Sequence, residues 1–415
     1  MVGSSVTGKL AFGLAFASAM AILVSIALSQ ILLALALGFL LLSRVPLRWP
    51  RVAVPFALFL GWTFVSLAFS PDPARGMIQV RKMFVYLMLL VAFSALSTIS
   101  RVKWMALGWM AIGTLTAARG LIQFWKDVLG ARAEHRDFYT YYISDRIRGF
   151  MSHWMTFSGQ EMFVLVILAS FLLFSPDIRR RLWLAVPCAA AVGLALVLSD
   201  TRSVWIASVG AIFYLLWMWN KRAALALPAI LLVGLIVAPK PIQERAMSIV
   251  KPKKQTDSNE HRIVCWRTGW QMIKAHPIVG VGPEEVSDAG VFDRYVPADI
   301  SRPLPDGWYG HLHNVYIQYA AERGIPAALF IIAVLAVAMR DLIRALRRLA
   351  PGRSDTRFIL NAAIASIIGT ALSGVFEHNL GDTEVLTMFL VILCAGYVAA
   401  ETKKAAVEEI APVAA

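Results

Sequence analysis

Residues 325–343 read IPAALFIIAVLAVAMRDLI, and segments of this kind decide the fold. Charge enters only at the end of the segment, and its length suits a membrane, because a helix rises about 1.5 Å per residue across about 30 Å of hydrocarbon. Similar apolar blocks recur along the chain, in which 58% of the 415 residues are hydrophobic and only 16% are charged. Soluble domains hold roughly 25% charged residues. The sequence therefore predicts an all-α polytopic membrane protein.

We expect about twelve transmembrane helices. The first two apolar blocks are short and nearly fused, so one tilted helix plus a re-entrant piece is an open alternative. We interpret the first block as a membrane anchor and not as a removed signal peptide, because it has no evident small-residue cleavage site. The approximate centres of the twelve helices are residues 10–26, 29–43, 53–69, 80–97, 104–124, 157–174, 182–198, 203–219, 223–238, 325–343, 359–376 and 384–400.

Basic residues predict the orientation of the chain. Short loops with many arginines and lysines stay in the cytoplasm, and both termini fall on the side of these loops. The two long segments, 126–156 and 239–312, then lie in the periplasm. The expected organisation is transmembrane helices one to nine in 1–238 with an outer loop at 126–156, a periplasmic loop domain with short helices in 239–324, transmembrane helices ten to twelve in 325–402, and a cytoplasmic tail in 403–415.

Composition also excludes several classes of function. The net charge of +14 does not indicate nucleic-acid binding, since many of the cations lie in short loops between apolar blocks. The three cysteines are far apart and show neither a disulfide framework nor metal-ligand spacing. Because the chain has no Walker loop, no GxSxG motif and no Asp-x-Asp pair, a cytosolic nucleotide-sugar donor is not supported.

The periplasmic loop domain should contain a helix that begins after Asn259, a candidate N-cap. The pair His276-Pro277 would end this helix, and a glycine turn would follow. The tract from Pro239 to Lys254 precedes it and is rich in proline and lysine. An apolar stripe at helical spacing is expected at Ile263, Trp266, Trp270 and Ile273.

Polar groups without an obvious topogenic role gather at or near the outer face. Ionisable groups near hydrocarbon are costly, which favours a functional role. Clustered arginines indicate an anionic ligand, because a guanidinium presents a planar fork of donors that matches phosphate oxygens. The residues expected to bind substrate are Arg81, Lys82, Arg146, Arg148, His153, His311, Asn314 and Glu377.

Arg202 and Arg262 are the strongest anion-binding candidates. Arg202 lies in a tight hairpin between two spans, and Arg262 lies in the first turn of the predicted helix, where unpaired N–H groups favour an anion. A snorkelling arginine and a solvated helix face are the respective alternatives. A solvated loop is the alternative for Arg146 and Arg148, and snorkelling is the alternative for Arg81 and Lys82.

His313 is the candidate general base, because a neutral imidazole can take a proton from a sugar hydroxyl near neutral pH. Asn314 could orient it or the acceptor. Gly324 and Pro326 should break the helix before the tenth span and leave His313 on a short helix at the membrane surface. A satisfied interfacial histidine is the alternative.

Two further questions concern the same segment. His311 and His313 are two residues apart, but no Cys or carboxylate cluster lies beside them in sequence, so no metal is expected. Glu161, Glu377 and Asp382 are second-choice bases, although pairing with an arginine at the outer face is the more common role for such carboxylates.

Three motifs resemble those of the O-antigen ligase and polymerase superfamily, and within it the O-antigen ligases. They resemble its Thr/Ser-Arg turn, its Arg-x3-Trp and His-Pro-x2-Gly-x-Gly run, and its His-Asn-x9-Gly motif. Ala327 departs from the Gly, Thr or Tyr that often ends the last pattern. The matching segments are Ser199-Asp200-Thr201-Arg202-Ser203, Arg262 to Trp266, His276 to Gly282, and His313-Asn314 to Gly324.

The resemblance implies an inverting glycosyltransferase of the GT-C group that needs neither a metal nor another cofactor. The donor would be O-antigen on undecaprenyl pyrophosphate, and the acceptor would be lipid A-core. The enzyme would lie in the cell inner membrane, in contact with membrane lipids, and its site would face the periplasm. Arg202 and Arg262 would hold the pyrophosphate, and His313 would be the base. A monomer that binds no nucleic acid is expected.

Three alternatives stay open. An O-antigen polymerase and an O-linked protein oligosaccharyltransferase share the expected architecture, and the large loop between spans nine and ten favours the ligase. A lipid-glycan transporter would place its site at mid-membrane within repeats. The polar groups crowd one face instead, and no repeat is visible.

Overall fold

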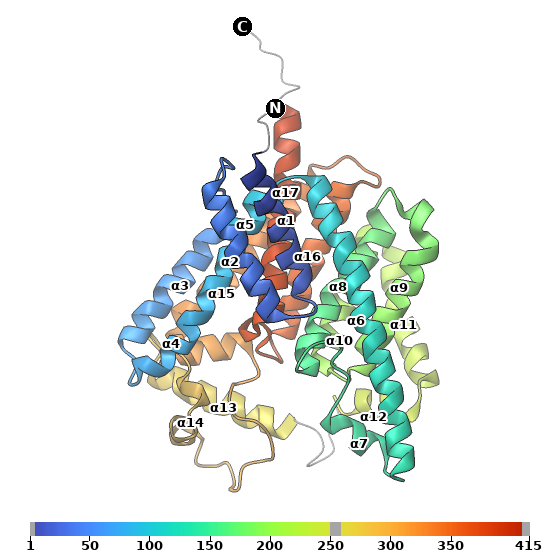
Figure 1. Cartoon of the computed structure of the whole chain (residues 1–415). Helices are drawn as coiled ribbons and strands as arrows, with labels where there is room; N and C mark the ends of the chain where they lie inside the picture. Colours follow the sequence, from blue (N-terminus) through green and yellow to red (C-terminus); the bar gives the residue numbers. More distant parts are fainter. Residues whose placement is uncertain (1–4, 250–258, 409–415) are drawn as a thin grey trace.

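The computed structural model describes residues 5–249 and 259–408, and within these residues it contains helices and no strand (Figure 1). The α-helices are α1 (Val6–Ala21), α2 (Ile26–Leu42), α3 (Ala53–Ala68), α4 (Pro73–Lys82), α5 (Leu87–Ala95), α6 (Ile99–Ala133), α7 (Phe138–Ser144), α8 (Trp154–Phe174), α9 (Ile178–Leu198), α10 (Arg202–Trp219), α11 (Lys221–Val237), α12 (Lys240–Met247), α13 (Asn259–Ala275), α14 (Ala289–Tyr295), α15 (Val315–Arg347), α16 (Asp355–Ser373) and α17 (Thr383–Glu408).

The apolar helices are those of a multi-pass membrane protein. Each of the twelve predicted blocks overlaps a helix of the structure. Within the described residues, however, only eight helical stretches are both long and apolar enough to cross a membrane, and α1, α2 and α3 are shorter. Twelve crossings therefore stay a prediction. The eight stretches are Pro73–Ala95, Ile99–Ala133, Trp154–Phe174, Ile178–Leu198, Arg202–Trp219, Val315–Arg347, Asp355–Ser373 and Thr383–Glu401.

Helices α1 and α2 form an antiparallel hairpin. One tilted helix plus a re-entrant piece stays an open alternative to two crossings, because both helices are shorter than the helices that can span a membrane. The hydroxyl of Ser18 donates to the Ser29 carbonyl (2.7 Å), and that of Ser29 donates to the Ser18 carbonyl (2.9 Å). The tip of the hairpin lies inside the bundle (Figure 1), where Trp109 of α6 donates to the carbonyl of Ala19 (2.6 Å) and Gln160 of α8 to that of Ile22 (2.9 Å). Each helix is about 25 Å long, shorter than the hydrocarbon core.

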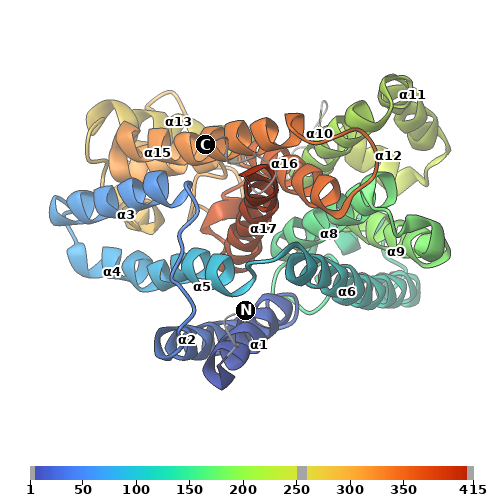
Figure 2. The same cartoon turned by 90° about the horizontal axis from the view of Figure 1, so that it is seen from above.

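The centre of the bundle is occupied by α17, which packs against α5, α8, α15 and α16 (Figure 2). Its residues Phe389, Leu390 and Val391 are fully buried. Because a helix that is apolar all round can be buried on every side, the sequence of α17 suits this position. The helices α9 and α11 lie at one edge of the bundle and the α1–α2 hairpin at another (Figure 2).

The start of α1 and the described end of α17 lie at the opposite end of the bundle from four short helices. The described parts of α1 and α17 begin and finish at one end, whereas α7, α12, α13 and α14 gather at the other (Figure 1). We call this second group the cap. Part of the predicted loop 126–156 is helical, because α6 continues to Ala133 and α7 follows. The predicted cytoplasmic tail 403–415 lies partly outside the described residues, and so does the Pro239–Lys254 tract.

The cap attaches to the bundle where α15 breaks. Gly324 has φ 80° and ψ 167°, a conformation that is essentially restricted to glycine. The break frees carbonyls, and the segment after α13 binds them: Val281 N donates to Ala321 O and Gly282 N to Glu322 O, both at 2.9 Å. A Cβ atom at Gly324 would lie 1.8 Å from the carbonyl oxygen of Ile278. The predicted helix break at Gly324 is thus confirmed, and it serves as the docking point.

The predicted apolar stripe of α13 is correct only in part. The helix begins at Asn259, but residues 250–258 lie outside the described part of the chain, so the capping role of Asn259 stays a prediction. Ile263 and Trp270 are 53% and 57% exposed, so these two members of the stripe are wrong, whereas Ile273 is buried and Trp266 is partly buried. The buried face instead contains Cys265 and Gly269, because small side chains let α13 approach α15 closely.

Candidate active site

A cavity of about 590 Å³ lies between the cap and the end of the bundle. We call it the main cavity. Its wall combines α4, α8, α10 and α13 with the loops before α15 and before α17. The fold thus brings together residues that are far apart in the sequence. The predicted site residues that line it are Lys82, Arg146, His153, Arg262, His311, His313 and Glu377.

Glu377 joins the two most distinctive residues of the main cavity. One carboxylate oxygen forms an ion pair with Arg262, and the other accepts from Nδ1 of His313 at 3.4 Å. Burial opposes the charge of Glu377, but Arg262 and the hydrogen bond from His313 outweigh it and lower the pKa of the carboxyl to about 2. Glu377 is therefore an anion that orients both partners.

His313 does not lie on a helix, so that part of the prediction is wrong. Its φ is 49°, in the left-handed region, and it directly precedes Asn314, the N-cap of α15. Asn314 accepts from the amides of Tyr316 and Ile317, both at 2.9 Å, and donates to Val375 O at 2.8 Å. These bonds tie the histidine loop to the loop of Glu377. Asn314 itself does not line the main cavity.

Neutral histidines surround His313. The ring centroid of His311 lies 4.1 Å from that of His313, and the ring of His261 lies 4.8 Å from it on another side. Burial and the neighbouring His313 lower the pKa of His261 to about 4 and that of His311 to about 3. Burial also lowers the pKa of His378. Near neutral pH these rings therefore add little positive charge.

The nitrogen Nε2 of His313 faces away from Glu377. Since the carboxylate of Glu377 can only accept, Nδ1 of His313 carries the proton of that hydrogen bond, and Nε2 holds a lone pair in the neutral ring. The carbonyl of Trp308 lies 3.3 Å from this Nε2. Because that carbonyl can only accept, a neutral ring with its proton on Nδ1 makes no hydrogen bond to Trp308, and Nε2 is then the ring atom that can take up a proton.

Arg202 lies in a neighbouring cavity of about 210 Å³, which we call the side cavity. Arg262 lines both cavities, so the two arginines share the side cavity although they come from α10 and α13. Arg202 is only 6% exposed, and its Nη1 donates to the carbonyl and the hydroxyl of Ser248 at 2.8 and 2.9 Å. The predicted convergence of Arg202 with Arg262 thus agrees with the geometry.

The turn before Arg202 collects further cations. Asp200 has φ 51°, and its carbonyl accepts from Arg146 (3.2 Å) and from Arg245 (2.9 Å). Burial raises the pKa of the Asp200 carboxyl to about 6, although the neighbouring arginines act to lower it. Burial also lowers the pKa of Arg146 to about 9. Arg245 lies in the Pro- and Lys-rich tract. It was not predicted as a site residue, because basic residues are common there.

Of the other predicted site residues, some line the main cavity and some lie outside it. His153 caps α8 and lines the main cavity, and Arg146 stacks 4.7 Å from the centroid of the Trp154 ring. Arg81 is exposed and does not line the main cavity. Arg148 pairs at the surface with Asp145 at 3.3 Å.

The second-choice bases Glu161 and Asp382 differ in whether they line the main cavity. Glu161 is buried in α8, where it accepts a hydrogen bond from Thr116, and it does not line the main cavity. Asp382 does line the main cavity, and it accepts a hydrogen bond from Thr156.

A cluster of polar residues in the wall of the main cavity was not predicted from the sequence. Glu322 of α15 accepts from the amide of Glu284 at 3.1 Å and from Gln318 at 2.9 Å, and Gln79 of α4 donates to Glu284. Glu284, Gln318, Glu322 and Gln79 all line the main cavity. The signal was available, because Glu322-Arg323 is a charged pair beside the helix break in an apolar helix.

Two comparisons with known proteins bear on this site. A family model described as O-antigen ligase matches residues 187–332. The match covers about a third of the chain and contains Arg202, Arg262 and His313, whereas Glu377 and Arg146 lie outside it. It supports an O-antigen ligase family assignment and, broadly, a ligase- or polymerase-type function. No curated protein matches the chain.

Proposed function

Because residues 187–332 match the O-antigen ligase family, we propose that the protein transfers O-antigen from undecaprenyl pyrophosphate to lipid A-core at the periplasmic face of the inner membrane. The observation that carries this proposal is the chain of contacts from Arg262 through Glu377 to His313 at the wall of one cavity. These contacts support a role for Arg262 in binding an anion and for His313 in accepting a proton. The proposed transfer from a lipid pyrophosphate uses both.

The proposed reaction is a single displacement at the first carbon of the donor sugar. The acceptor hydroxyl loses its proton to Nε2 of His313 as its oxygen forms the new glycosidic bond. The bond between that carbon and the phosphate oxygen breaks, and undecaprenyl pyrophosphate leaves with the electron pair. Glu377 stabilises the imidazolium that results, as a carboxylate does beside a histidine base.

The arginines would stabilise the leaving group. Positive charge placed where negative charge develops can lower the barrier more than any other single effect. Arg262 lines both cavities and Arg202 lines the side cavity, so in this proposal the two guanidinium groups hold the pyrophosphate. Arg146 adds a third guanidinium at the main cavity. The residues present supply the base and the cations, and the reaction as written uses no metal or other cofactor.

The direct test is glycan transfer by the purified protein from lipid-linked O-antigen to lipid A-core. We expect His313→Ala to reduce transfer by about 10²–10⁴-fold, the usual contribution of a general base. The matched control is His276→Ala, because His276 is exposed at the end of α13 and bonds only Tyr295 among the described residues. Full transfer by His313→Ala would refute its role as the base.

A genetic test separates the ligase from the polymerase. In a strain without this protein, a ligase defect leaves bare core on a lipopolysaccharide gel while lipid-linked polymer accumulates. A polymerase defect leaves core capped with single repeats, and that outcome would replace the proposed reaction.

A further inference from the structure

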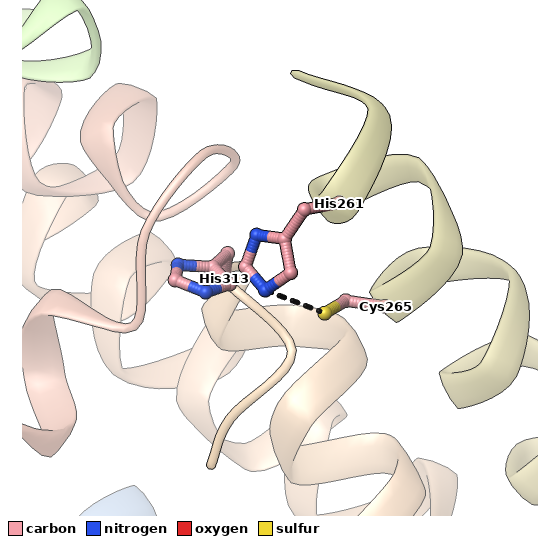
Figure 3. A group of neighbouring side chains, drawn as sticks. All are labelled: His261, Cys265 and His313. Carbon is pink, nitrogen blue, oxygen red and sulfur yellow. Dashed lines mark hydrogen bonds between the residues drawn. The ribbon is translucent and has the colours of Figure 1, made fainter. Parts of the chain in front are cut away.

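Three side chains with metal-binding atoms meet at the edge of the main cavity, namely His261, Cys265 and His313 (Figure 3). His261 and Cys265 lie one turn apart on α13, and Sγ of Cys265 is 3.6 Å from Nε2 of His261. All three residues are buried, and their ligand atoms lie within 4.8 Å of one another. The fold thus supplies the cysteine that the sequence around His313 lacks.

The distances suit a tetrahedral site. With a Zn–S bond of about 2.3 Å and a Zn–N bond of about 2.0–2.1 Å, the sulfur and nitrogen ligands stand about 3.6 Å apart. One thiolate with two imidazoles is a soft donor set, which favours Zn²⁺ and similar ions over Mg²⁺ or Ca²⁺. The chemistry of the cluster therefore identifies the class of ion.

Glu377 and Trp308 complete the surroundings. Metal-binding histidines usually donate their other ring N–H to a carboxylate, and Glu377 accepts from Nδ1 of His313 in this way. The carbonyl oxygen of Trp308 lies 2.7 Å from Nε2 of His261 and 3.3 Å from Nε2 of His313. Both nitrogens thus point to one region, where the carbonyl or a water can be the fourth ligand.

We propose that His261, Cys265 and His313 bind a soft divalent transition metal ion, and that this ion inhibits the protein by occupying Nε2 of His313. The inhibition rests on the proposed function, whereas the binding does not. On binding, the thiol proton of Cys265 passes to the buffer. The Nε2 proton of His261 moves to Nδ1, which is buried without a hydrogen-bond partner among the described residues. The lone pairs of sulfur and both Nε2 atoms then bind the ion.

Direct binding is tested with Co²⁺ on the purified full-length protein. We expect a thiolate-to-cobalt charge-transfer absorption in wild type that excess Zn²⁺ abolishes and excess Mg²⁺ leaves. Cys265→Ser and Cys265→Ala should both lose the absorption. Cys394→Ser is the matched control, since Cys394 is also buried but lies in α17 against the carbonyl of Leu89, and it should keep the absorption. Absence of the band in wild type, or its persistence in Cys265→Ser, would overturn the site.

Inhibition is tested by glycan transfer. Zn²⁺ should lower wild-type transfer, and a chelator should restore it. Cys265→Ser should keep basal transfer and need at least about tenfold more Zn²⁺ for the same inhibition, given the loss of one ligand. Equal Zn²⁺ sensitivity of the two proteins would refute the inhibitory role. If no protein transfers glycan, the proposed function fails while the Co²⁺ absorption still decides the site.

Discussion

The two ends of the helical bundle differ in how deeply many of their charged residues are buried. At the end where α1 begins, many arginines in or beside the connections between helices are exposed, namely Arg44, Arg51, Arg179, Arg180, Arg344, Arg347 and Arg348. Lys103 differs from them, because it is only 18% exposed and pairs with Asp177 and Asp355. At the cavity end, Arg202, Arg245, His313 and Glu377 are each at most 6% exposed.

This difference separates two roles of charge. Exposed arginines that only set topology need no partner, and their contribution to stability is small. A buried charge is costly unless it is paired and hydrogen-bonded. The cavity end keeps its charges buried and paired at that cost, which is the pattern of a functional site.

The largest effect on folding and transfer should come from a substitution that separates the cap from the bundle. Without the cap the cavity end would no longer exist as one of the two ends compared. Gly324→Ala adds a Cβ atom that would lie 1.8 Å from Ile278 O, in a conformation that costs on the order of 1–3 kcal/mol for a non-glycine residue. We expect loss of folded protein on size-exclusion chromatography and loss of transfer. Gly234→Ala is the control, because no atom lies within 4 Å of its added Cβ. Normal folding of Gly324→Ala would contradict the docking role.

Next in size is the replacement of one arginine by lysine at each end. Arg202→Lys removes the bidentate fork from the side cavity, and loss of such a donor lowers turnover by about 10²–10³-fold. Arg344→Lys at the other end should leave turnover unchanged, since Arg344 is exposed. The measurement is the transfer rate at saturating donor. Similar rates for both variants would remove the distinction between the two ends.

A smaller effect is expected from Glu377→Gln, which keeps the shape of the side chain and removes its charge. A hydrogen bond to a charged group contributes about 1.5–3 kcal/mol, so turnover should fall by about 10- to 100-fold. The fall should appear in kcat and not in KM, because Glu377 acts through His313 and Arg262. A rise in KM alone would mean that Glu377 binds substrate instead.

The smallest effect concerns pH and stability. The folded pKa of Glu377 is about 2, below its ordinary value of 4.5, so its ionised form stabilises the fold. That stabilisation is complete above the ordinary value and is lost as the pH falls toward the folded value. The Tm difference between wild type and Glu377→Gln should therefore be constant from about pH 6 to pH 8 and shrink near pH 3. A difference that grows on acidification would contradict the assigned charge.

Part of this site could be predicted from the sequence because its signals are local. Arg262 lies where α13 begins, the pair His276-Pro277 follows its last residue, Ala275, and Gly324 breaks α15 as predicted. Glycine, proline and helix-start patterns act over a few residues, so no tertiary information was needed.

The rest depends on contacts between distant segments. Glu377 is 64 residues from His313 and 115 from Arg262. Its pairing with an arginine could be predicted as a common role, but the sequence did not show which arginine or that His313 is its second partner. The face of α13 was misassigned in part because packing against α15 selects small residues such as Gly269 over large apolar ones. The proximity of Cys265 to His313 was not predicted either, because it depends on how α13 packs against the rest of the fold.

The central claim is that Arg202, Arg262 and His313 act on one lipid-linked pyrophosphate, and an experimental structure with that lipid bound tests it most directly. We predict phosphate density between the guanidinium groups of Arg202 and Arg262, with the first sugar facing Nε2 of His313. Phosphate density at the end with the exposed arginines, or in a cavity that none of these three residues lines, would contradict the claim.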